Sequence, residues 1–588
     1  MKQRLQIFLI LSTILFTGAF LSLSHFSPTR FETFCDQFFQ EEMAANSLTQ
    51  HYTVANPEDY GIHCKEISLG TYDLNLPAQK KWLYTKWLTL KSIARGTLSK
   101  KQQLTYDLLC CTIETEIDGL EYALLKEPLV PSIGIQSQLP ILLAEYAFRE
   151  EADVVNYLTL LSCVPKYFDS ILALEEKRLA EHLFMDKESA EELISYCQEF
   201  LAEKETHFLT QTFLERLSGL SLSPERIKLY EKEHEKLLKS YVFPAYERLK
   251  DFLSKHKTDG VYEKGLCQIP GGTDYYAWLL RSEVGTDKTF EEIKNLLESA
   301  LKEDAASIAK LLEKNPDLLE QKNKLSFNSF SSSGLTAFLS KRISKDFPET
   351  DKVSVKICDV PASMEPHLSP AFYLVPPIDD NDNHIVYLNN GSLTNDLSFF
   401  TTLAHESYPG HLYQTVFENA SHPHPVHRLL YFGGYIEGWA TYAEQLSYHY
   451  APISSDLATL LSCSRAMTLN LYSHLDLYIH AYGWTEKDCA DYLKNFGITT
   501  AQSVHDMFLL VKQQPANYLK YYLGYLEICE LHKEAEELLG EDFDLKEFHE
   551  FLLEYGPAPF PLLKKELHNL TKKTASLRSS LFHDYLLF

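Results

Sequence analysis

The sequence predicts a mainly α-helical protein with a small β-sheet directly before a histidine-rich motif. Amphipathic segments of helical period run from about residue 30 to 260, for example at 189–205 and 224–253. Helices dominate again from about 285 onward, whereas short β-rich runs lie between roughly 353 and 390. With 588 residues and 45% apolar content, the chain can bury a substantial core. We therefore expect a large helical architecture with a deep cleft and the sheet at its wall.

The N-terminus has the pattern of an export segment. Lys2 and Arg4 precede an uncharged, largely apolar run from Leu5 to Leu23. A run of this length fits both a cleaved signal peptide and a membrane anchor that spans the bilayer. The first cysteine is Cys35, too far behind the run to favour a lipoprotein. Positive charge before the run predicts an extracytoplasmic protein, either secreted or anchored by residues 5–23.

The rest of the chain shows no internal repeat and no long low-complexity linker. We assign residues 1–24 to the signal peptide or membrane anchor. Residues 25–260 form a helical N-terminal region, and residues 261–588 form the region that holds the candidate site. Three runs in the second region, DKVSVKIC, AFYLVPP and HIVYLNN, have the composition of short strands bounded by Pro, Asp and Asn.

The motif His405-Glu406-Ser407-Tyr408-Pro409-Gly410-His411 has the residue types of a catalytic zinc site. On an unbroken helix, His411 would lie roughly 240° around the axis from His405 and could not share a metal with it. Pro409 and Gly410 can break the helix and return His411 toward His405. Glu406 would then lie beside the metal as a general base for water. The alternative is a helix, a turn and two ordinary polar histidines.

Glu437 and Glu444 follow in the run YIEGWATYAE. They are seven residues apart, about two helical turns, and therefore share one face of a helix. One carboxylate can bind a metal while the other orients a histidine. A solvated amphipathic face would produce the same spacing.

At these motifs the chain resembles a bacterial family known as domain of unknown function 885. That family carries a pattern close to HEGYPGHHLQ followed by EGWAxYAE, and this chain reads HESYPGHLYQ and EGWATYAE. The resemblance extends to IPGGTDYYAWLLR upstream and to FHEFLLEYGPAPFPLL near the C-terminus. The chain departs from the pattern at Ser407 and Leu412, where the family usually has glycine and histidine, and at Ala516 and Asn517, where it usually has glycine and glutamine.

The family is similar in plan to gluzincin zinc peptidases, which place an edge strand beside the metal. The resemblance therefore implies a metallopeptidase-like architecture with one Zn²⁺ per chain, held by His405, His411 and Glu437. It also favours Tyr521, in the segment PANYLKYYLGYLEICEL, as the donor that stabilises an oxyanion. An aromatic stripe that only packs is the alternative for this tyrosine.

Other polar residues are candidates for supporting roles. Arg465, Asp476 and His480 are a polar set in a helical region, and with Glu444 they could orient ligands or bind substrate. A structural ion pair is the alternative for the set. Three histidines lie in the loop-like run SHPHPVH, where a metal could bind adventitiously: His422, His424 and His427.

Composition excludes several classes of function. The net charge is −26 and no basic stretch could follow a phosphate backbone, so nucleic acid is not an expected partner. A Walker-type phosphate loop and a Gly-x-Ser-x-Gly elbow are both absent from the sequence. The 11 cysteines are an odd number without a Cys-x-x-Cys pair, and we expect mostly free buried thiols.

The sequence therefore predicts an exported zinc-dependent peptidase that acts on peptide substrates and contacts the membrane only through its N-terminal segment. Two alternatives stay open. One is a non-catalytic peptide-binding protein on a metallopeptidase scaffold. The other is a metal-dependent amidase that acts on non-peptide amides.

Overall fold

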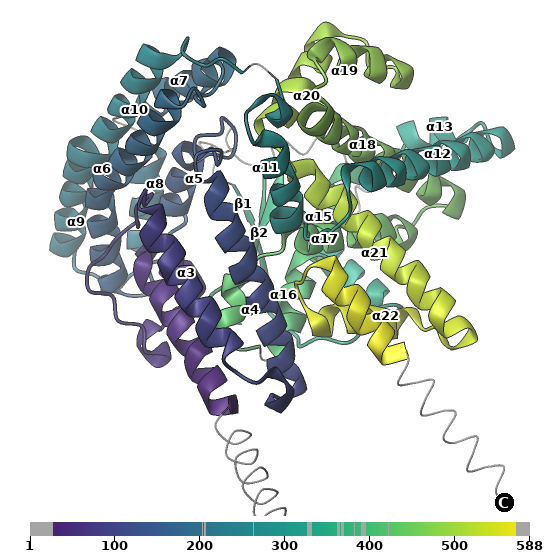
Figure 1. The fold of residues 1–588 in the computed structure, drawn as a ribbon, viewed down its shortest axis with the longest axis horizontal. Helices are drawn as coiled ribbons and strands as arrows, with labels where there is room; N and C mark the ends of the chain where they lie inside the picture. Colours follow the sequence, from purple (N-terminus) through teal and green to yellow (C-terminus); the bar gives the residue numbers. More distant parts are fainter. Residues whose placement is uncertain are drawn as a thin grey trace, which may run out of the picture.

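The computed structural model shows a mainly helical protein with one three-stranded sheet among the described residues, which confirms the predicted fold class (Figure 1). The described residues are 27–202, 204, 207–262, 264–325, 332–360, 365, 370–380, 383–389, 396–421 and 423–571. The apolar run at 5–23 lies outside them. Within the described chain, no helix is both long and apolar enough to cross a bilayer.

The first part of the chain is helical, as expected. A helix covers residues 27–45, and α4 begins with a capping box in which Ser99 and Gln102 satisfy each other's backbone N–H groups. The helices that follow in this part are α2 (Ser47–Thr53), α3 (Leu76–Lys91), α4 (Lys100–Gly119), α5 (Ile135–Ala144), α6 (Glu151–Ala180), α7 (Lys187–Ala202), α8 (Phe208–Ser218), α9 (Pro224–Leu237) and α10 (Phe243–His256).

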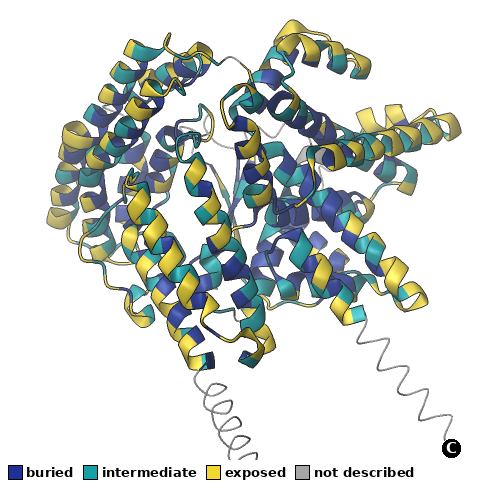
Figure 2. Ribbon diagram, in the orientation of Figure 1, coloured by how far each residue is buried: buried dark blue, intermediate teal, exposed yellow. Residues whose placement is uncertain are grey.

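The second part contains the sheet and the longer central helices. Its helices are α11 (Gly272–Leu279), α12 (Phe290–Lys314), α13 (Leu318–Asn323), α14 (Ser332–Arg342), α15 (Asp396–Glu406), α16 (His411–Ala420), α17 (Gly433–Tyr450), α18 (Ser455–Tyr482), α19 (Glu486–Leu493), α20 (Ala501–Gln513), α21 (Asn517–Leu539) and α22 (Leu545–Tyr555). Helix α17 lies in the middle of the molecule, and most of its residues are buried (Figure 2).

The sheet lies within the predicted interval. Its strands are β1 (Val355–Asp359), β2 (Ala371–Leu374) and β3 (His384–Leu388), in the order β1-β3-β2. Strand β1 is parallel to β3, and β2 is antiparallel to β3 with Tyr373 opposite Val386. Strand β2 is therefore an edge strand, and α15 packs beside it. This places an edge of the sheet next to the helix that begins the histidine motif.

The largest apolar core is built from both parts of the chain. It includes Phe31 and Phe39 of the first helix, Leu108 of α4, and Tyr435 and Trp439 of α17. A second core lies mainly among α5 to α10, around Tyr157 and Tyr246. The first helices thus pack directly on the elements that carry the site. The division of the chain into two regions at residues 260 and 261 stays a prediction.

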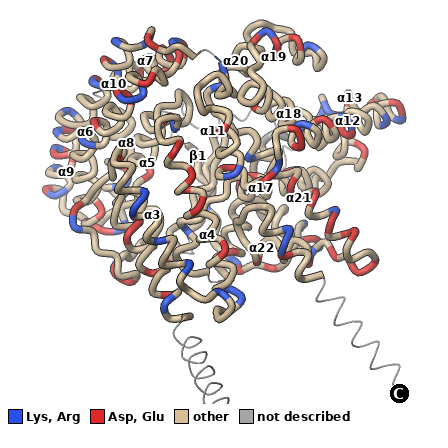
Figure 3. The backbone as a smooth tube through the Cα atoms, in the orientation of Figure 1, with Lys and Arg blue, Asp and Glu red and all other residues tan. Residues whose placement is uncertain are grey.

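Acidic and basic residues are interspersed along the outer helices (Figure 3). All 11 cysteines are unpaired, and Cys35, Cys110, Cys197 and Cys489 are buried. This agrees with the expectation of mostly free thiols.

Candidate metal centre

The histidine motif breaks its helix where the sequence predicts. Helix α15 ends at Glu406 and α16 begins at His411, and the Tyr408–Pro409 peptide bond between them is cis. The N–H of Gly410 donates to the carbonyl of Ala404 at 3.1 Å. A Cβ atom on Gly410 would overlap the carbonyl oxygen of His405, so only glycine fits this close return of the chain.

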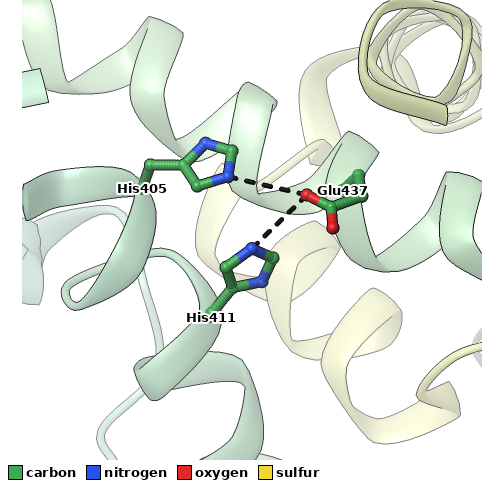
Figure 4. Close-up of side chains that lie close together, drawn as sticks. All are labelled: His405, His411 and Glu437. Atoms are coloured by element: carbon green, nitrogen blue, oxygen red, sulfur yellow. Dashed lines mark ion pairs between the residues drawn. The ribbon is translucent and has the colours of Figure 1, made fainter. Parts of the chain in front are cut away.

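The break brings three candidate ligands to one point, with the side chains of His405, His411 and Glu437 turned toward one another (Figure 4). Their ligand atoms all lie within 4.8 Å of one another. Glu437 Oε2 lies 3.6 Å from His405 Nε2 and 3.5 Å from His411 Nε2. Tetrahedral zinc with bonds of about 2.0–2.2 Å sets neighbouring ligand atoms about 3.4 Å apart. Two imidazoles and one carboxylate at these separations fit zinc.

A second carboxylate on α17 reaches the other side of His405. Glu444 Oε2 lies 3.5 Å from His405 Nδ1, and Arg465 Nε on α18 donates to Glu444 Oε1 at 2.7 Å. Burial alone would raise the pKa of Glu444, but Arg465 and His405 lower it to about 2. The carboxylate therefore stays ionised and can hold the Nδ1 proton of His405, which leaves Nε2 free as a ligand atom.

The surrounding charges favour a cation at the centre. Burial would lower the pKa of His405, but Glu437 and Glu444 raise it to about 10. Burial would raise the pKa of Glu437, yet His411 and His405 hold it far below its usual range. The carboxylates thus stabilise positive charge at this point, and a divalent cation would supply that charge.

Glu406 lies between the candidate metal ligands and the edge strand. The backbone N–H of Tyr373 in β2 donates to Glu406 Oε2 at 2.9 Å and fixes that oxygen. Burial raises the pKa of Glu406, and the two histidines only partly oppose this effect. A buried carboxylate with a raised pKa beside a metal site is suited to accept and return a proton. The sequence motif predicted that Glu406 lies beside the two histidines, but it did not predict the hydrogen bond between Glu406 and Tyr373 of β2.

Tyr521 on α21 packs against the site. Its ring lies 6.2 Å from the ring of His405, with 24° between their planes. Burial, and next the charge of Glu437, raise the pKa of Tyr521, so its hydroxyl stays protonated and can donate. The neighbouring tyrosines have other contacts: Tyr518 stacks on Tyr472, while Tyr525 packs against Tyr442.

Asp476 and His480 are not brought to the candidate metal ligands. Asp476 Oδ1 accepts hydrogen bonds from the Tyr276 hydroxyl at 2.7 Å and from the N–H of Ala516 at 2.9 Å. His480 Nε2 lies 3.1 Å from the carbonyl of Val511, to which it can donate. Asp476 therefore connects α18 to α11 and to the turn before α21, and His480 connects α18 to α20. Only Arg465 of this predicted set reaches the centre.

The turn before α21 explains one departure from the family pattern. Ala516 has φ = 66°, in the left-handed region that glycine adopts without strain. The family's glycine suits this conformation, and here the bond to Asp476 holds an alanine in it.

The histidines of the loop-like run lie elsewhere. His424 Nε2 is 3.1 Å from Asp36, and His427 Nε2 is 2.9 Å from the Thr105 hydroxyl. His422 lies outside the described residues. The two described histidines thus connect the loop to the N-terminal helices.

Sequence reasoning missed the residues that bring α17 and α21 together. Cβ atoms on Gly438 and Gly524 would overlap the backbone of the opposite helix, so the two helices touch directly. Trp439 is fully buried and donates to the carbonyl of Pro409 at 3.0 Å, which fixes the helix break. The four-residue spacing of Gly434 and Gly438 was the available signal for close helix packing.

Comparisons with known proteins agree with this architecture. A family model described as "Bacterial protein of unknown function (DUF885)" matches residues 73–567. A structure described as "the putative lipoprotein from Colwellia psychrerythraea" superposes with a TM-score of 0.79 at 18% identity, covering 93% of this chain and 99% of that one. A "putative lipoprotein of unknown function from Shewanella oneidensis" superposes with a TM-score of 0.64 at 17% identity, covering 91% of this chain and 99% of that one. No curated protein matches the chain. These identities show a shared fold alone.

Proposed function

The chain belongs to the DUF885 family of bacterial proteins, and from that premise we propose that it is an exported zinc-dependent metallopeptidase of gluzincin-like plan. One observation carries the proposal: His405, His411 and Glu437 converge from three helices with Glu406 beside them. When bound by these three ligands, zinc polarises a substrate carbonyl and lowers the pKa of a water to about 7.

Glu406 performs the proton transfers in this proposal. Its carboxylate accepts a proton from the attacking water and then delivers it to the leaving amine. The N–H of Tyr373 holds Oε2 in place, which orients the other carboxylate oxygen for the transfer. Burial raises the pKa of Glu406 and so makes it a stronger base than an exposed glutamate.

Tyr521 donates a hydrogen bond to the oxyanion that develops on the scissile carbonyl. Its contact with His405 places the ring at the centre, and its raised pKa keeps the hydroxyl protonated. Preorganised donors of this kind contribute about 10²–10³ to kcat.

The outer edge of β2 binds the substrate backbone. Successive residues of an edge strand point their N–H and C=O groups alternately toward and away from the sheet. The N–H of Tyr373 points to Glu406, and its carbonyl shares that outer edge. An extended peptide pairing there would pass the metal with modest demands on its sequence.

Export is supported by the charged and apolar pattern of residues 2–23. It is also supported by two proteins of the same fold that are described as putative lipoproteins. For this chain we propose secretion or a membrane anchor through residues 5–23.

The direct test is the variant Glu406→Gln. It should keep the zinc content and melting temperature of the parent while losing at least about 100-fold in peptide turnover, because general-base catalysis contributes about 10²–10⁴. Glu418→Gln, on the adjacent helix α16, is the matched control and should retain activity. Unchanged turnover in Glu406→Gln would overturn the role of this residue.

A further inference from the structure

A cavity of about 350 Å³ lies between the helical N-terminal region and the helices that carry the site. Helices α6 and α7 and residues 125–133 form one wall, while α11, α20 and the start of α21 form the other. A volume of this size is in the range of small-ligand sites. The cavity is distinct from the metal centre, since it contains none of the three candidate ligands.

Two lysines give the cavity a cationic wall. The Lys512 side chain is only 8% exposed and the Lys520 side chain 17%. Lys512 lies 3.2 Å from Asp186, and Lys520 lies 3.7 Å from Glu283; among the described residues, these are the only ion pairs of the two lysines within 4.0 Å. Because each ammonium group has three donors, both retain donors for a ligand. An anion is the ligand that such a wall accepts.

Lys264 and Arg178 also line the cavity, and its three carboxylates, Glu127, Asp186 and Glu283, pair with Arg178, Lys512 and Lys520. Arg178 donates to Glu127 at 2.5 Å and to the carbonyls of Leu124 at 2.6 Å and Leu183 at 3.1 Å. Arg178 therefore holds the wall together, whereas the two lysines are placed to bind.

The cavity also offers apolar surface. Ile133 lines it and is 48% exposed, although a large aliphatic side chain usually prefers burial. Leu129 and Pro131 line the same wall. An apolar side chain next to an anionic group would match both kinds of lining.

Helix α21 connects the cationic wall to the metal centre. Lys520 directly precedes Tyr521 on α21, and Asn517 lines the cavity one turn earlier. Gly433, four residues before Glu437 on α17, is so close to Lys520 and to the carbonyl of Glu283 that a Cβ atom would crowd both. Helix α21 thus carries both Tyr521 and part of this wall, and α17, which carries Glu437, packs against it.

We propose that this cavity binds a carboxylate of the peptide substrate through Lys512 and Lys520, next to an apolar side chain, while the scissile bond lies at the metal centre. This inference rests on the proposed peptidase function and names its substrate class. A free C-terminus and an acidic side chain both carry the required carboxylate, and the two sources can be separated by experiment.

The test is equilibrium binding to the full chain carrying Glu406→Gln, which prevents turnover. Three probes are compared by calorimetry: N-acetyl-Ala-Ala-Leu as the free acid, the same peptide as the C-terminal amide, and N-acetyl-Ala-Ala-Glu amide. We expect a carboxylate-bearing probe to bind at least tenfold more tightly than the leucine amide. The free acid identifies the C-terminus as the source, and the glutamate amide identifies a side chain.

Lys512→Met and Lys520→Met, each added to this background, should abolish the preference. Lys487→Met, an exposed lysine on α19 with an 82% exposed side chain, should leave it unchanged. Lys512→Met also removes the contact with Asp186, so Lys520→Met keeps the test decisive if the first variant does not fold. Equal binding of all three probes, or a preference that survives in the folded lysine variants, would overturn the proposal. Because the readout is binding, its failure leaves hydrolysis by Glu406 untouched.

Discussion

Gly438 of α17 and Gly524 of α21 are in direct backbone contact, so close that a Cβ atom on either would overlap the other helix. Glu437 precedes the first glycine by one residue, and Tyr521 precedes the second by three. The contact therefore sets the separation between a proposed metal ligand and the proposed oxyanion donor. Small residues permit this approach because they leave no side chain between the helices.

Gly438→Ala should push the two helices apart. Overpacking of this kind lowers the free energy of unfolding by about 1–3 kcal/mol. Zinc affinity should also fall, because the added methyl group moves the neighbouring Glu437. Chemical denaturation and zinc titration measure the two effects. Gly96→Ala is the control, since nothing lies within 4 Å of the added Cβ, and it should change neither quantity. Parent-like stability in Gly438→Ala would contradict the contact.

Glu444→Gln should weaken zinc binding about 10–100-fold, because a neutral amide orients His405 less strongly than a carboxylate. Arg465→Met should act in the same direction through Glu444. Competition with a chelator measures the affinity. Asp118→Asn, which removes an exposed pair with Arg281, should have no effect. Equal zinc affinity in parent and Glu444→Gln would refute the orienting role.

Tyr521→Phe should lower kcat by about 10²–10³ with little change in KM, because an oxyanion donor acts mainly in the transition state. Zinc content should be unchanged. Tyr518→Phe is the matched control on the same helix, since that ring stacks on Tyr472 instead of His405. A Tyr521→Phe variant with parent kcat would reduce this tyrosine to a packing role.

Asp476 should make stability depend on pH. Burial raises its pKa from 3.8 to about 7, against the hydrogen bonds from Tyr276 and Ala516. Between pH 3.8 and about pH 7, the Asp476 carboxyl keeps its proton in the folded protein but has released it in the unfolded chain. The free energy of unfolding therefore falls as pH rises through this range. At 1.36 kcal/mol per pKa unit, the upper limit is about 4 kcal/mol.

Asp476→Asn removes this titration while keeping an oxygen acceptor. From pH 4 to 7, its unfolding free energy should therefore decline less than that of the parent. Asp491→Asn, at an exposed position on α19, is the control and should follow the parent. Parallel pH profiles for parent and Asp476→Asn would show that Asp476 does not titrate in this window.

The convergence of His405, His411 and Glu437 could be predicted from the sequence because its geometry is local. Helical period placed Glu437 and Glu444 on one face of α17, and the structure directs both toward His405. The properties of proline and glycine predicted the helix break that returns His411. In each case a short stretch of backbone determines where the side chain lies.

Contacts between distant helices could not be predicted in the same way. The spacing of Arg465, Asp476 and His480 grouped them, but their partners depend on which helix packs against each face of α18. Arg465 meets Glu444 on α17, whereas Asp476 meets Tyr276 on α11. The cavity likewise combines segments separated by several hundred residues, so no local pattern indicated it.

The most direct test of the central claim is the metal content of purified residues 25–588, prepared without added metal, beside the variant His411→Ala. About one zinc per chain, lost in His411→Ala and retained in His424→Ala, is the result that the convergence of His405, His411 and Glu437 predicts. No bound metal after zinc is supplied at neutral pH, or zinc that His411→Ala retains, would contradict a metal centre at these three residues.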